Sequence, residues 1–258
     1  MNNMNHIEYA VADGVATIRF NRPEKKNAIT LEMYTAFTQA LTQANADSEV
    51  RAVLITGAGD AFTSGNDIAN FRDRSGREDG GGAEPFMLAI VNSEKPLIAA
   101  VNGVAIGVGA TMLLHCDLVY ASHKATIKMP FVSLGICSEF ASSLTLPAVM
   151  GLQRATEMLL LAEPVSAQKA FEYGLVNAVC EPEQLYEVAL SAAQRIAQQP
   201  QESVRATRAF LRDAQRLQHA QRLVEERRMI TTLLNSPAAR NAFDVFFSRR
   251  DNVQDTAV

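Results

Sequence analysis

Two glycine-bearing turns have residue types that could stabilise negative charge on a substrate oxygen. The first spans residues 63–68 (TSGNDI) and the second spans residues 103–109 (GVAIGVG), and both follow apolar runs. Small residues let a ligand approach the backbone closely. If the second turn opens a helix, its free N–H groups point outward at the positive end of the helix dipole, where they can hold an oxyanion. The alternative is that the glycines only shape strand-to-helix turns.

Competing motifs fail on spacing. A dinucleotide-binding loop that begins at Gly107 would need its third glycine where Met112 stands, and one that begins at Gly57 would need it where Phe62 stands. The sequence contains neither a GxxxxGK[ST] phosphate loop nor a GxSxG nucleophile elbow. The four histidines lack metal-ligand spacing, so we expect no metal site and interpret His115 as a packed helix residue.

Composition narrows the class of protein. A chain of 258 residues can bury a sizeable core as one domain. The net charge of −4 argues against nucleic-acid binding as the main activity. Three cysteines without a CxxC pair predict reduced, mostly buried thiols. We find no secretory signal and no apolar run long enough for a transmembrane helix, so we expect a cytoplasmic protein without membrane contact.

The elements that position the two turns alternate between strands and helices. Asp13-Gly14 lies between β-rich runs and predicts a hairpin, and Thr30 is a suitable N-cap for a helix over residues 31–46. Buried strands are predicted at residues 52–56, 96–101 and 118–120. Further helices are expected to start at Pro182 and Pro200. This order predicts an α/β fold with a partly parallel sheet.

The order of several short segments resembles the crotonase (enoyl-CoA hydratase/isomerase) family. These segments are NRPEKKNA at 21–28, SGNDI at 64–68, KPLIAAVNGVAIG at 95–107, CD at 116–117, MPF at 129–131, SLG at 133–135 and GLV at 174–176. The match covers nearly the whole chain. The resemblance implies one crotonase-like domain over residues 1–258, with a ββα spiral over about 1–195 and C-terminal helices over about 196–258 that form trimers. It implies a homotrimer or a dimer of trimers, an acyl-CoA substrate, and no cofactor apart from the CoA of that substrate.

The same resemblance assigns roles to residues around the two turns. The backbone N–H groups that grip the thioester oxygen in the family correspond to those of Asn66 and Val108. The set of residues expected to line the substrate comprises Lys25, Lys26, Ala28, Ser64, Asp67, Ile68, Phe131 and Leu134. The segment from Lys25 to Ala28 would face the adenine and phosphate end of CoA, and a solvated loop is the alternative there. Arg249 falls where the family often places a cation near the CoA phosphates, although a role as an ordinary surface residue is favoured.

Both glutamates of the family's hydratases are missing. The first would stand where Thr111 is, and the second where Phe131 is. Adding water to a double bond requires a group that takes the proton of the water and a group that protonates carbon. The sequence therefore predicts a poor hydratase.

Glu139 offers a carboxylate at a different position. The segment around it, GICSEFASS at 135–143, is similar to the corresponding part of Δ3,Δ2-enoyl-CoA isomerases, in which one glutamate is the sole acid/base. Cys137-Ser138 and Phe140 depart from that pattern. Apolar neighbours such as Leu134 would raise the pKa of Glu139 and suit it to both proton transfers. The alternative is that Glu139 only caps a helix that starts near Phe140.

Two further hypotheses remain open. The family also carries out hydration, dehalogenation, decarboxylation and ring chemistry, because fold does not fix function. A non-catalytic binder of CoA thioesters or RNA is the other hypothesis, and it rests on an arginine stripe, which comprises Arg205, Arg208, Arg212 and Arg216. We favour a solvated face for this stripe, balanced by Asp213, Glu225 and Glu226. The polar segment at 72–85 is expected to be a surface insertion or a lid.

Overall fold

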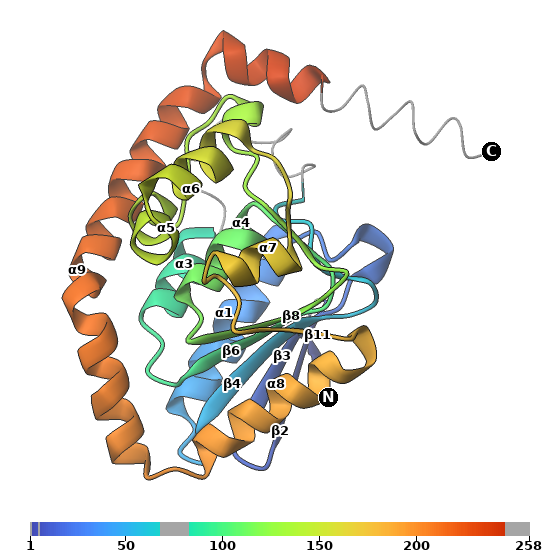
Figure 1. Ribbon diagram of the computed structural model, residues 1–258, viewed down its shortest axis with the longest axis vertical. Helices are drawn as coiled ribbons and strands as arrows, with labels where there is room; N and C mark the ends of the chain where they lie inside the picture. Colours follow the sequence, from blue (N-terminus) through green and yellow to red (C-terminus); the bar gives the residue numbers. More distant parts are fainter. Residues whose placement is uncertain (1, 5, 68–82, 246–258) are drawn as a thin grey trace.

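The computed structural model describes residues 2–4, 6–67 and 83–245 of the chain (Figure 1). Ile68 and Arg249 lie outside the described residues, as does most of the segment at 72–85. The described part is a mixture of helices and strands, which confirms the expected α/β class.

The larger sheet carries the buried strands that the apolar runs predict. In the part of the chain that the structure describes, its strands are ordered β1-β2-β3-β4-β6-β8-β11. Their bounds are Asn2–Met4, Ile7–Ala12, Val15–Phe20, Ala52–Gly57, Leu97–Val101, Leu118–Ser122 and Ala178–Cys180. The strands from β3 to β11 pair in parallel, whereas β1, β2 and β3 pair antiparallel. The partly parallel sheet is therefore confirmed.

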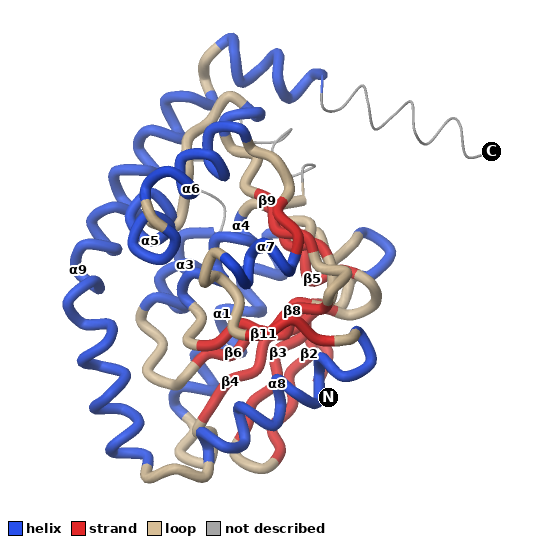
Figure 2. Tube along the Cα trace, in the orientation of Figure 1, coloured by secondary structure: helices blue, strands red, loops and turns tan. Residues whose placement is uncertain are grey.

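A smaller sheet stands apart from the larger one (Figure 2). Its strand order is β10-β9-β7-β5, with bounds Val165–Ser166, Thr126–Lys128, Val104–Ile106 and Ala61–Thr63. Strands β5, β7 and β9 run parallel. Gly65 follows β5 and Gly107 follows β7, so the smaller sheet brings the two glycine-bearing segments to the same edge. Residues 104–106 of the second segment, expected to be part of a turn, form β7 itself.

The helices cover both faces of the larger sheet. The α-helices with both ends among the described residues include α1 (Leu31–Ala46), α3 (Ala83–Val91), α4 (Val108–Thr111), α5 (Ser142–Met150), α6 (Leu152–Thr156), α7 (Ala167–Glu172), α8 (Pro182–Ala197) and α9 (Gln201–Leu234), and residues 237–245 are also helical. Short 3-10 helices are η1 (Pro23–Lys25), η3 (Met112–His115) and η4 (Val132–Leu134), and η5 (Glu157–Leu161) is a π-helix. Helix α9 runs along one side of the molecule, outside α3 and α5 (Figure 1). None of the described helices is long and apolar enough to cross a bilayer.

The alternation of side chains along β4 divides the core in two. Val53 and Ile55 pack into the larger hydrophobic cluster, with α1 and α3, while Ala52 and Leu54 pack with α8 on the opposite face. Successive strand residues point to opposite faces, so a strand buried on both sides is apolar throughout. Full burial of a side chain such as that of Leu54 contributes about 1.5–3 kcal/mol.

Local signals in the sequence fix the first elements. The hairpin is confirmed, because Asp13 and Gly14 have φ of 51° and 77° and Ala12 pairs with Val15. The helix over 31–46 is also confirmed. The hydroxyl of Thr30 accepts a hydrogen bond from the N–H of Met33 at 3.2 Å, which caps the first turn of that helix.

Arginines on α9 show that the prediction of a solvated stripe is wrong in part, because Arg205 is exposed but Arg208 and Arg212 are only partly so. The Nε atoms of Arg208 and Arg212 each lie 2.9 Å from a carboxylate oxygen of Asp117, and all three side chains are largely buried. Asp117 also accepts the N–H of Leu97 at 2.7 Å. The two arginines therefore fasten α9 to the sheet and share the one carboxylate of Asp117. This weakens the support for an RNA-binding stripe, because two of its four members already have a partner within the chain.

Candidate active site

The two glycine-bearing turns pack directly against each other. A Cβ atom on Gly65 would lie 2.5 Å from the carbonyl oxygen of Ile106, and one on Gly109 would overlap the side chain of Thr63. Contacts this short do not occur at real Cβ atoms, so both positions require glycine. At Gly65 and Gly109 the structural explanation of the glycines is therefore correct, and close approach of a ligand is not needed to explain them.

Gly107 has a different reason to be glycine. Its φ of 58° and ψ of −122° lie in a region that L side chains rarely adopt. A Cβ atom there would meet nothing within 4 Å, so the space beside Gly107 is open. Its N–H donates to the carbonyl of Lys128 at 2.9 Å, which fixes the turn. This backbone conformation directs the chain from β7 into α4.

Asn66 and Val108 each present a backbone N–H that has no hydrogen-bond partner among the described residues, and so does Gly109, which follows Val108 in α4. The N–H groups on either side of Asn66 are paired, since Gly65 donates to the Thr63 hydroxyl and Asp67 donates to the carbonyl of Ile29. Val108 is the first residue of α4, where backbone donors lack an intrahelical acceptor. Asn66 and Val108 are the two residues that the sequence analysis assigned to the oxyanion hole.

Side chains of the first turn hold its backbone in place. The hydroxyl of Tyr34 on α1 donates to the side-chain oxygen of Asn66. The carboxylate of Asp67 lies 2.5 Å from Nη1 of Arg22, which also donates to the carbonyl of Ala28 at 3.1 Å. Asp67 is thus tied to the loop at 22–28 and can position the turn without touching a substrate.

The loop at 22–28 lies beside the first turn. The N–H of Ser64 donates to the carbonyl of Lys26 at 2.9 Å, and the hydroxyl of Thr63 donates to the carbonyl of Asn27 at 2.6 Å. Lys25 and Lys26 are exposed. Two cations that sequence analysis placed near the substrate phosphates therefore lie next to the candidate site, with their ammonium groups accessible to an anion.

The turn after Glu139 carries two residues in an uncommon conformation. Phe140 and Ala141 have φ of 60° and 54°, and both are fully buried. Left-handed conformations at residues other than glycine cost about 1–3 kcal/mol each and persist only where the surrounding structure enforces them. The backbone carbonyl of Glu139 accepts two hydrogen bonds from Ser142, one from its N–H at 3.1 Å and one from its side-chain hydroxyl at 2.7 Å. One oxygen of the Glu139 carboxylate, Oε1, is buried.

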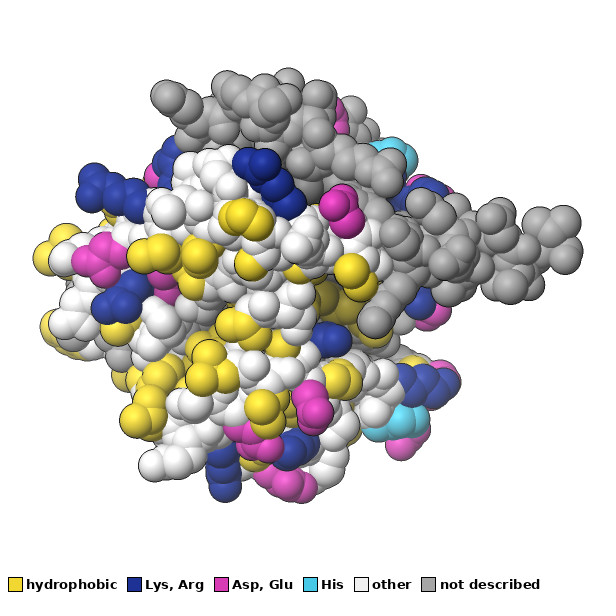
Figure 3. Space-filling model, turned by 90° about the horizontal axis from the view of Figure 1, so that it is seen from above, with side chains coloured by type: hydrophobic (Ala, Val, Ile, Leu, Met, Phe, Trp, Pro, Cys, Tyr) yellow, Lys and Arg dark blue, Asp and Glu magenta, His cyan; other side chains and the backbone are white. Residues whose placement is uncertain are grey.

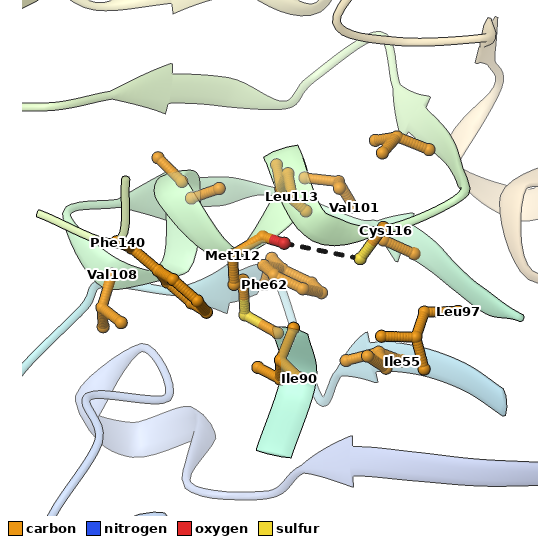
Figure 4. Packing of buried hydrophobic residues seen from close by; sticks show 14 of the residues in the cluster. Ile55, Phe62, Ile90, Leu97, Val101, Val108, Met112, Leu113, Cys116 and Phe140 are labelled. Atoms are coloured by element: carbon orange, nitrogen blue, oxygen red, sulfur yellow. Dashed lines mark hydrogen bonds between the residues drawn. The ribbon is translucent and has the colours of Figure 1, made fainter. Parts of the chain in front are cut away.

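Phe140 and Val108 enter the same hydrophobic cluster. Figure 4 shows both side chains in this cluster with those of Phe62 and Met112. The ring of Phe140 stacks on the imidazole of His115, with 4.2 Å between centroids. The residue after Glu139 is therefore packed in one core with the residue that presents the second N–H. The expectation of a packed His115 is confirmed.

No carboxylate stands at positions 111 and 131, to which the sequence resemblance assigned the two glutamates of hydratases. Thr111 is fully buried, and its hydroxyl lies 3.3 Å from the carbonyl of Gly107. Phe131 is buried and Leu134 packs against the core in the segment just before Glu139. These two apolar side chains precede Glu139 in the segment between β9 and α5, and the expectation that they surround its carboxylate stays a prediction.

Glu226 on α9 is the residue that sequence analysis misplaced, since it was expected on a solvated face. It is only 7 % exposed. Its Oε2 accepts the N–H of Ala141 at 2.7 Å, and its Oε1 accepts the hydroxyl of Ser143 at 2.5 Å. The carboxylate that meets the start of α5 is thus that of Glu226. The sequence carries only a weak signal for the burial of Glu226. This signal is the apolar residue Leu223, which stands three positions earlier and is also buried.

Figure 3 views the upper end of the molecule as it is drawn in Figure 1. Hydrophobic side chains gather around a recess on this face, and a lysine or arginine lies at its edge. An apolar recess with few polar groups is the usual form of a site for a small organic ligand.

Comparisons with known proteins give a consistent result. A family model described as enoyl-CoA hydratase/isomerase matches residues 10–255. The enoyl-CoA delta isomerase 2 of Rattus norvegicus is 40 % identical over 206 residues, which are 77 % of this chain and 52 % of the rat protein. The chain therefore spans only part of that relative's length.

Two more relatives widen the range of reactions. The crotonyl-CoA hydratase of Syntrophomonas wolfei is 36 % identical over 199 residues, or 76 % of each protein. The crystal structure of an enoyl-CoA hydratase/isomerase from Pseudoalteromonas atlantica has a TM-score of 0.90 at 36 % identity and covers 95 % of this chain and 98 % of that one. The predicted fold is therefore confirmed, while the relatives differ in the reactions for which they are named.

Proposed function

Because this chain belongs to the enoyl-CoA hydratase/isomerase family, we propose that it is an enoyl-CoA isomerase that shifts a double bond from C3–C4 to C2–C3 of an acyl-CoA. The observation that carries the proposal is the position of the acid. Glu139 stands in the turn packed against the Val108 cluster, while Thr111 and Phe131 occupy the places of the hydratase carboxylates. A site with one carboxylate suits a reaction that moves one proton between two carbons.

In the proposed reaction Glu139 first acts as a base. It takes a proton from C2, and the electron pair of that C–H bond forms a dienolate with negative charge on the thioester oxygen. The N–H groups of Asn66 and Val108 donate to that oxygen. Each such donor is typically worth about 10²–10³ in rate, and a placed general base about 10²–10⁴.

Glu139 then acts as an acid. The protonated carboxyl returns the proton to C4, the C2–C3 double bond forms, and the thioester carbonyl is restored. Both carbons lie on one face of the planar dienolate, within reach of one carboxylate. The buried surroundings of Phe131 and Leu134 would exclude water, which limits competing hydration.

The proposed CoA contacts follow the loop at 22–28. The exposed ammonium groups of Lys25 and Lys26 would pair with the CoA phosphates, while Ala28 and Ser64 would pass close to the adenine end. Asp67 and Ile68 would stand beside them. CoA enters as part of the substrate, and the proposed chemistry requires no metal or redox cofactor.

We propose that the protein acts as a homotrimer or a dimer of trimers in the degradation of unsaturated acyl chains. Apolar side chains on the outer side of α9 support an interface there, since Phe210, Leu217 and Val224 are exposed at intervals of one heptad. Light scattering on the purified protein tests this. A mass of about 28 kDa, the mass of one chain, would contradict the assembly.

A paired assay tests the reaction. The purified protein receives a 3-enoyl-CoA in one reaction and crotonyl-CoA in the other, with Glu139→Gln as the test variant and the exposed Glu157→Gln as its matched control. We expect fast formation of the 2-enoyl-CoA, little hydration, and loss of at least about 100-fold in kcat for Glu139→Gln only. Hydration faster than isomerisation would contradict the proposal and favour a hydratase. Isomerisation that survives in Glu139→Gln would contradict the role proposed for Glu139.

A further inference from the structure

The backbone after Glu139 is held by three side chains, and two of them contact the two ends of the single peptide group that joins Phe140 and Ala141. The carbonyl of Glu139 is held by Ser142. The carbonyl of Phe140 lies 2.7 Å from Nε2 of His115, and the N–H of Ala141 lies 2.7 Å from Oε2 of Glu226. Two of these partners are buried ionisable side chains from distant segments, one at the end of η3 and one in the middle of α9.

His115 can only donate in this arrangement. A carbonyl oxygen accepts hydrogen bonds, so the proton must be on Nε2 of His115. Burial lowers the pKa of His115 to about 3, so the ring is neutral at any working pH and has one N–H to give. Its ring also stacks on that of Phe140, which fixes the side chain and the carbonyl of the same residue.

Glu226 holds the opposite side of the turn. Its two carboxylate oxygens accept from Ala141 and from Ser143, and Oε1 also lies 3.4 Å from the hydroxyl of Ser138. Glu226 thus bridges the residue before Glu139 to the residues after it. A charged acceptor makes stronger hydrogen bonds than a neutral one, which suits a site where the backbone must be held against strain.

We infer that Glu226 and His115 are positioning residues, which hold the left-handed turn at Phe140–Ala141 from two sides and so direct the carboxylate of Glu139 toward the substrate. This inference rests on the proposed function. It gives α9 a part in the reaction of its own subunit that is separate from any role in assembly. Neither residue needs to touch the substrate for this effect.

Replacing Glu226 separates its possible roles. Glu226→Leu removes both acceptors, Glu226→Gln keeps one side-chain oxygen in the same place, and Glu225→Leu changes an exposed neighbour on the same helix. We expect Glu226→Leu to lower kcat on a 3-enoyl-CoA about 10- to 100-fold with KM changed less than about threefold, because misplacing a reacting group costs about that much. Glu226→Gln should retain most of kcat, and Glu225→Leu all of it.

A second-site change tests the strain directly. Ala141→Gly removes the cost of a positive φ at that position, so it should restore part of kcat when combined with Glu226→Leu. If Glu226 only stabilised the fold, kcat would change only together with the thermal midpoint in these variants. Recovery of kcat in the double variant without a matching recovery of the thermal midpoint would therefore indicate a positioning role. Full kcat in a folded Glu226→Leu protein would overturn the inference.

Amide hydrogen exchange provides a measurement that needs no turnover. The N–H of Ala141 is protected by Glu226, so peptides that contain residues 138–145 should exchange faster in Glu226→Leu and in His115→Leu than in Glu225→Leu. Unchanged exchange there would also overturn the inference. If Glu139→Gln retains activity, the proposed function fails instead, and if only the Glu226 variants behave as wild type, the inference alone fails.

Discussion

The carboxylate of Glu226 accepts a hydrogen bond from the backbone N–H of Ala141 at 2.7 Å, although 85 residues separate them along the chain. This contact ties the long C-terminal helix to the turn that carries Glu139. If Glu139 transfers protons as proposed, stability and proton transfer are linked at this contact, and the link can be measured.

The charge on Glu226 should make stability depend on pH in a definite direction. Burial raises the pKa of Glu226 above 4.5, although hydrogen bonds from Ser143 and Ala141 and the charge of Arg222 oppose the shift. A raised pKa in the folded state gives stability that is present below the unfolded pKa and lost as the pH rises through the folded pKa.

Replacing Glu226 by glutamine should remove this dependence. The free energy of unfolding of wild type should therefore fall relative to that of Glu226→Gln as the pH rises from about 4 to 7. Urea unfolding at several pH values measures the difference, with Glu225→Gln as the surface control. A difference that is constant with pH would show that Glu226 does not have a raised pKa.

His115 should produce the opposite slope. Its pKa is lowered from 6.5 to about 3, mainly by burial. Between pH 6.5 and about pH 3, His115 is therefore protonated in the unfolded chain and neutral in the folded chain. As the pH falls through this window, the free energy of unfolding of wild type should decrease by about 1.4 kcal/mol per pH unit through His115 alone. The variant His115→Leu should lack that contribution, whereas the exposed His123→Gln should keep it. Equal slopes for wild type and His115→Leu would contradict the burial of a neutral ring.

Gly107 and Gly151 form a matched pair of glycines. Both have positive φ, and a Cβ atom on either would meet no atom within 4 Å. Alanine at either position should cost about 1–3 kcal/mol through backbone strain. Only Gly107→Ala should also lower kcat, by about 10-fold or more, because it moves the N–H of Val108. Thermal unfolding and steady-state kinetics on both variants decide this, and an equal loss of kcat in the two would argue against a role for the turn.

Asp117 should be critical for the attachment of α9. Its carboxylate accepts from Arg208, Arg212 and the N–H of Leu97. Asp117→Asn leaves two arginines without a charged partner, so we expect a loss of about 2–4 kcal/mol in the free energy of unfolding. Urea unfolding measures it, and exchange of α9 amides should rise together with it. A loss below about 0.5 kcal/mol would indicate that α9 is held by other contacts.

Local signals predicted much of the fold, and the reason is physical. Asp13-Gly14 determines a hairpin and Thr30 caps a helix through bonds to residues within three positions. Strands buried on both faces must be apolar along their whole length, so residues 52–56 could be identified without knowledge of their neighbours. The motifs also led to Asn66 and Val108, whose N–H groups lack partners among the described residues.

Long-range polar contacts could not be predicted in the same way. Asp117 and Arg208 are 91 residues apart, and no spacing rule links them. A helix with charges on several sides is predicted to be exposed to solvent, whether or not some of those charges form ion pairs with a buried residue. The glycines at 65 and 109 were recognised, but their close contacts with Ile106 and Thr63 depend on the register of β5 and β7.

The position of α9 also bears on the order in which the protein is made. A ribosome releases the chain from its N-terminus, so residues 1–200 emerge before Arg208, Arg212 and Glu226. The turn at Phe140–Ala141 therefore lacks its contact with Glu226 until α9 has been synthesised and has docked. A nascent chain would therefore form its sheets before this turn is held by Glu226, and the catalysis proposed for Glu139 would depend on the docking of α9.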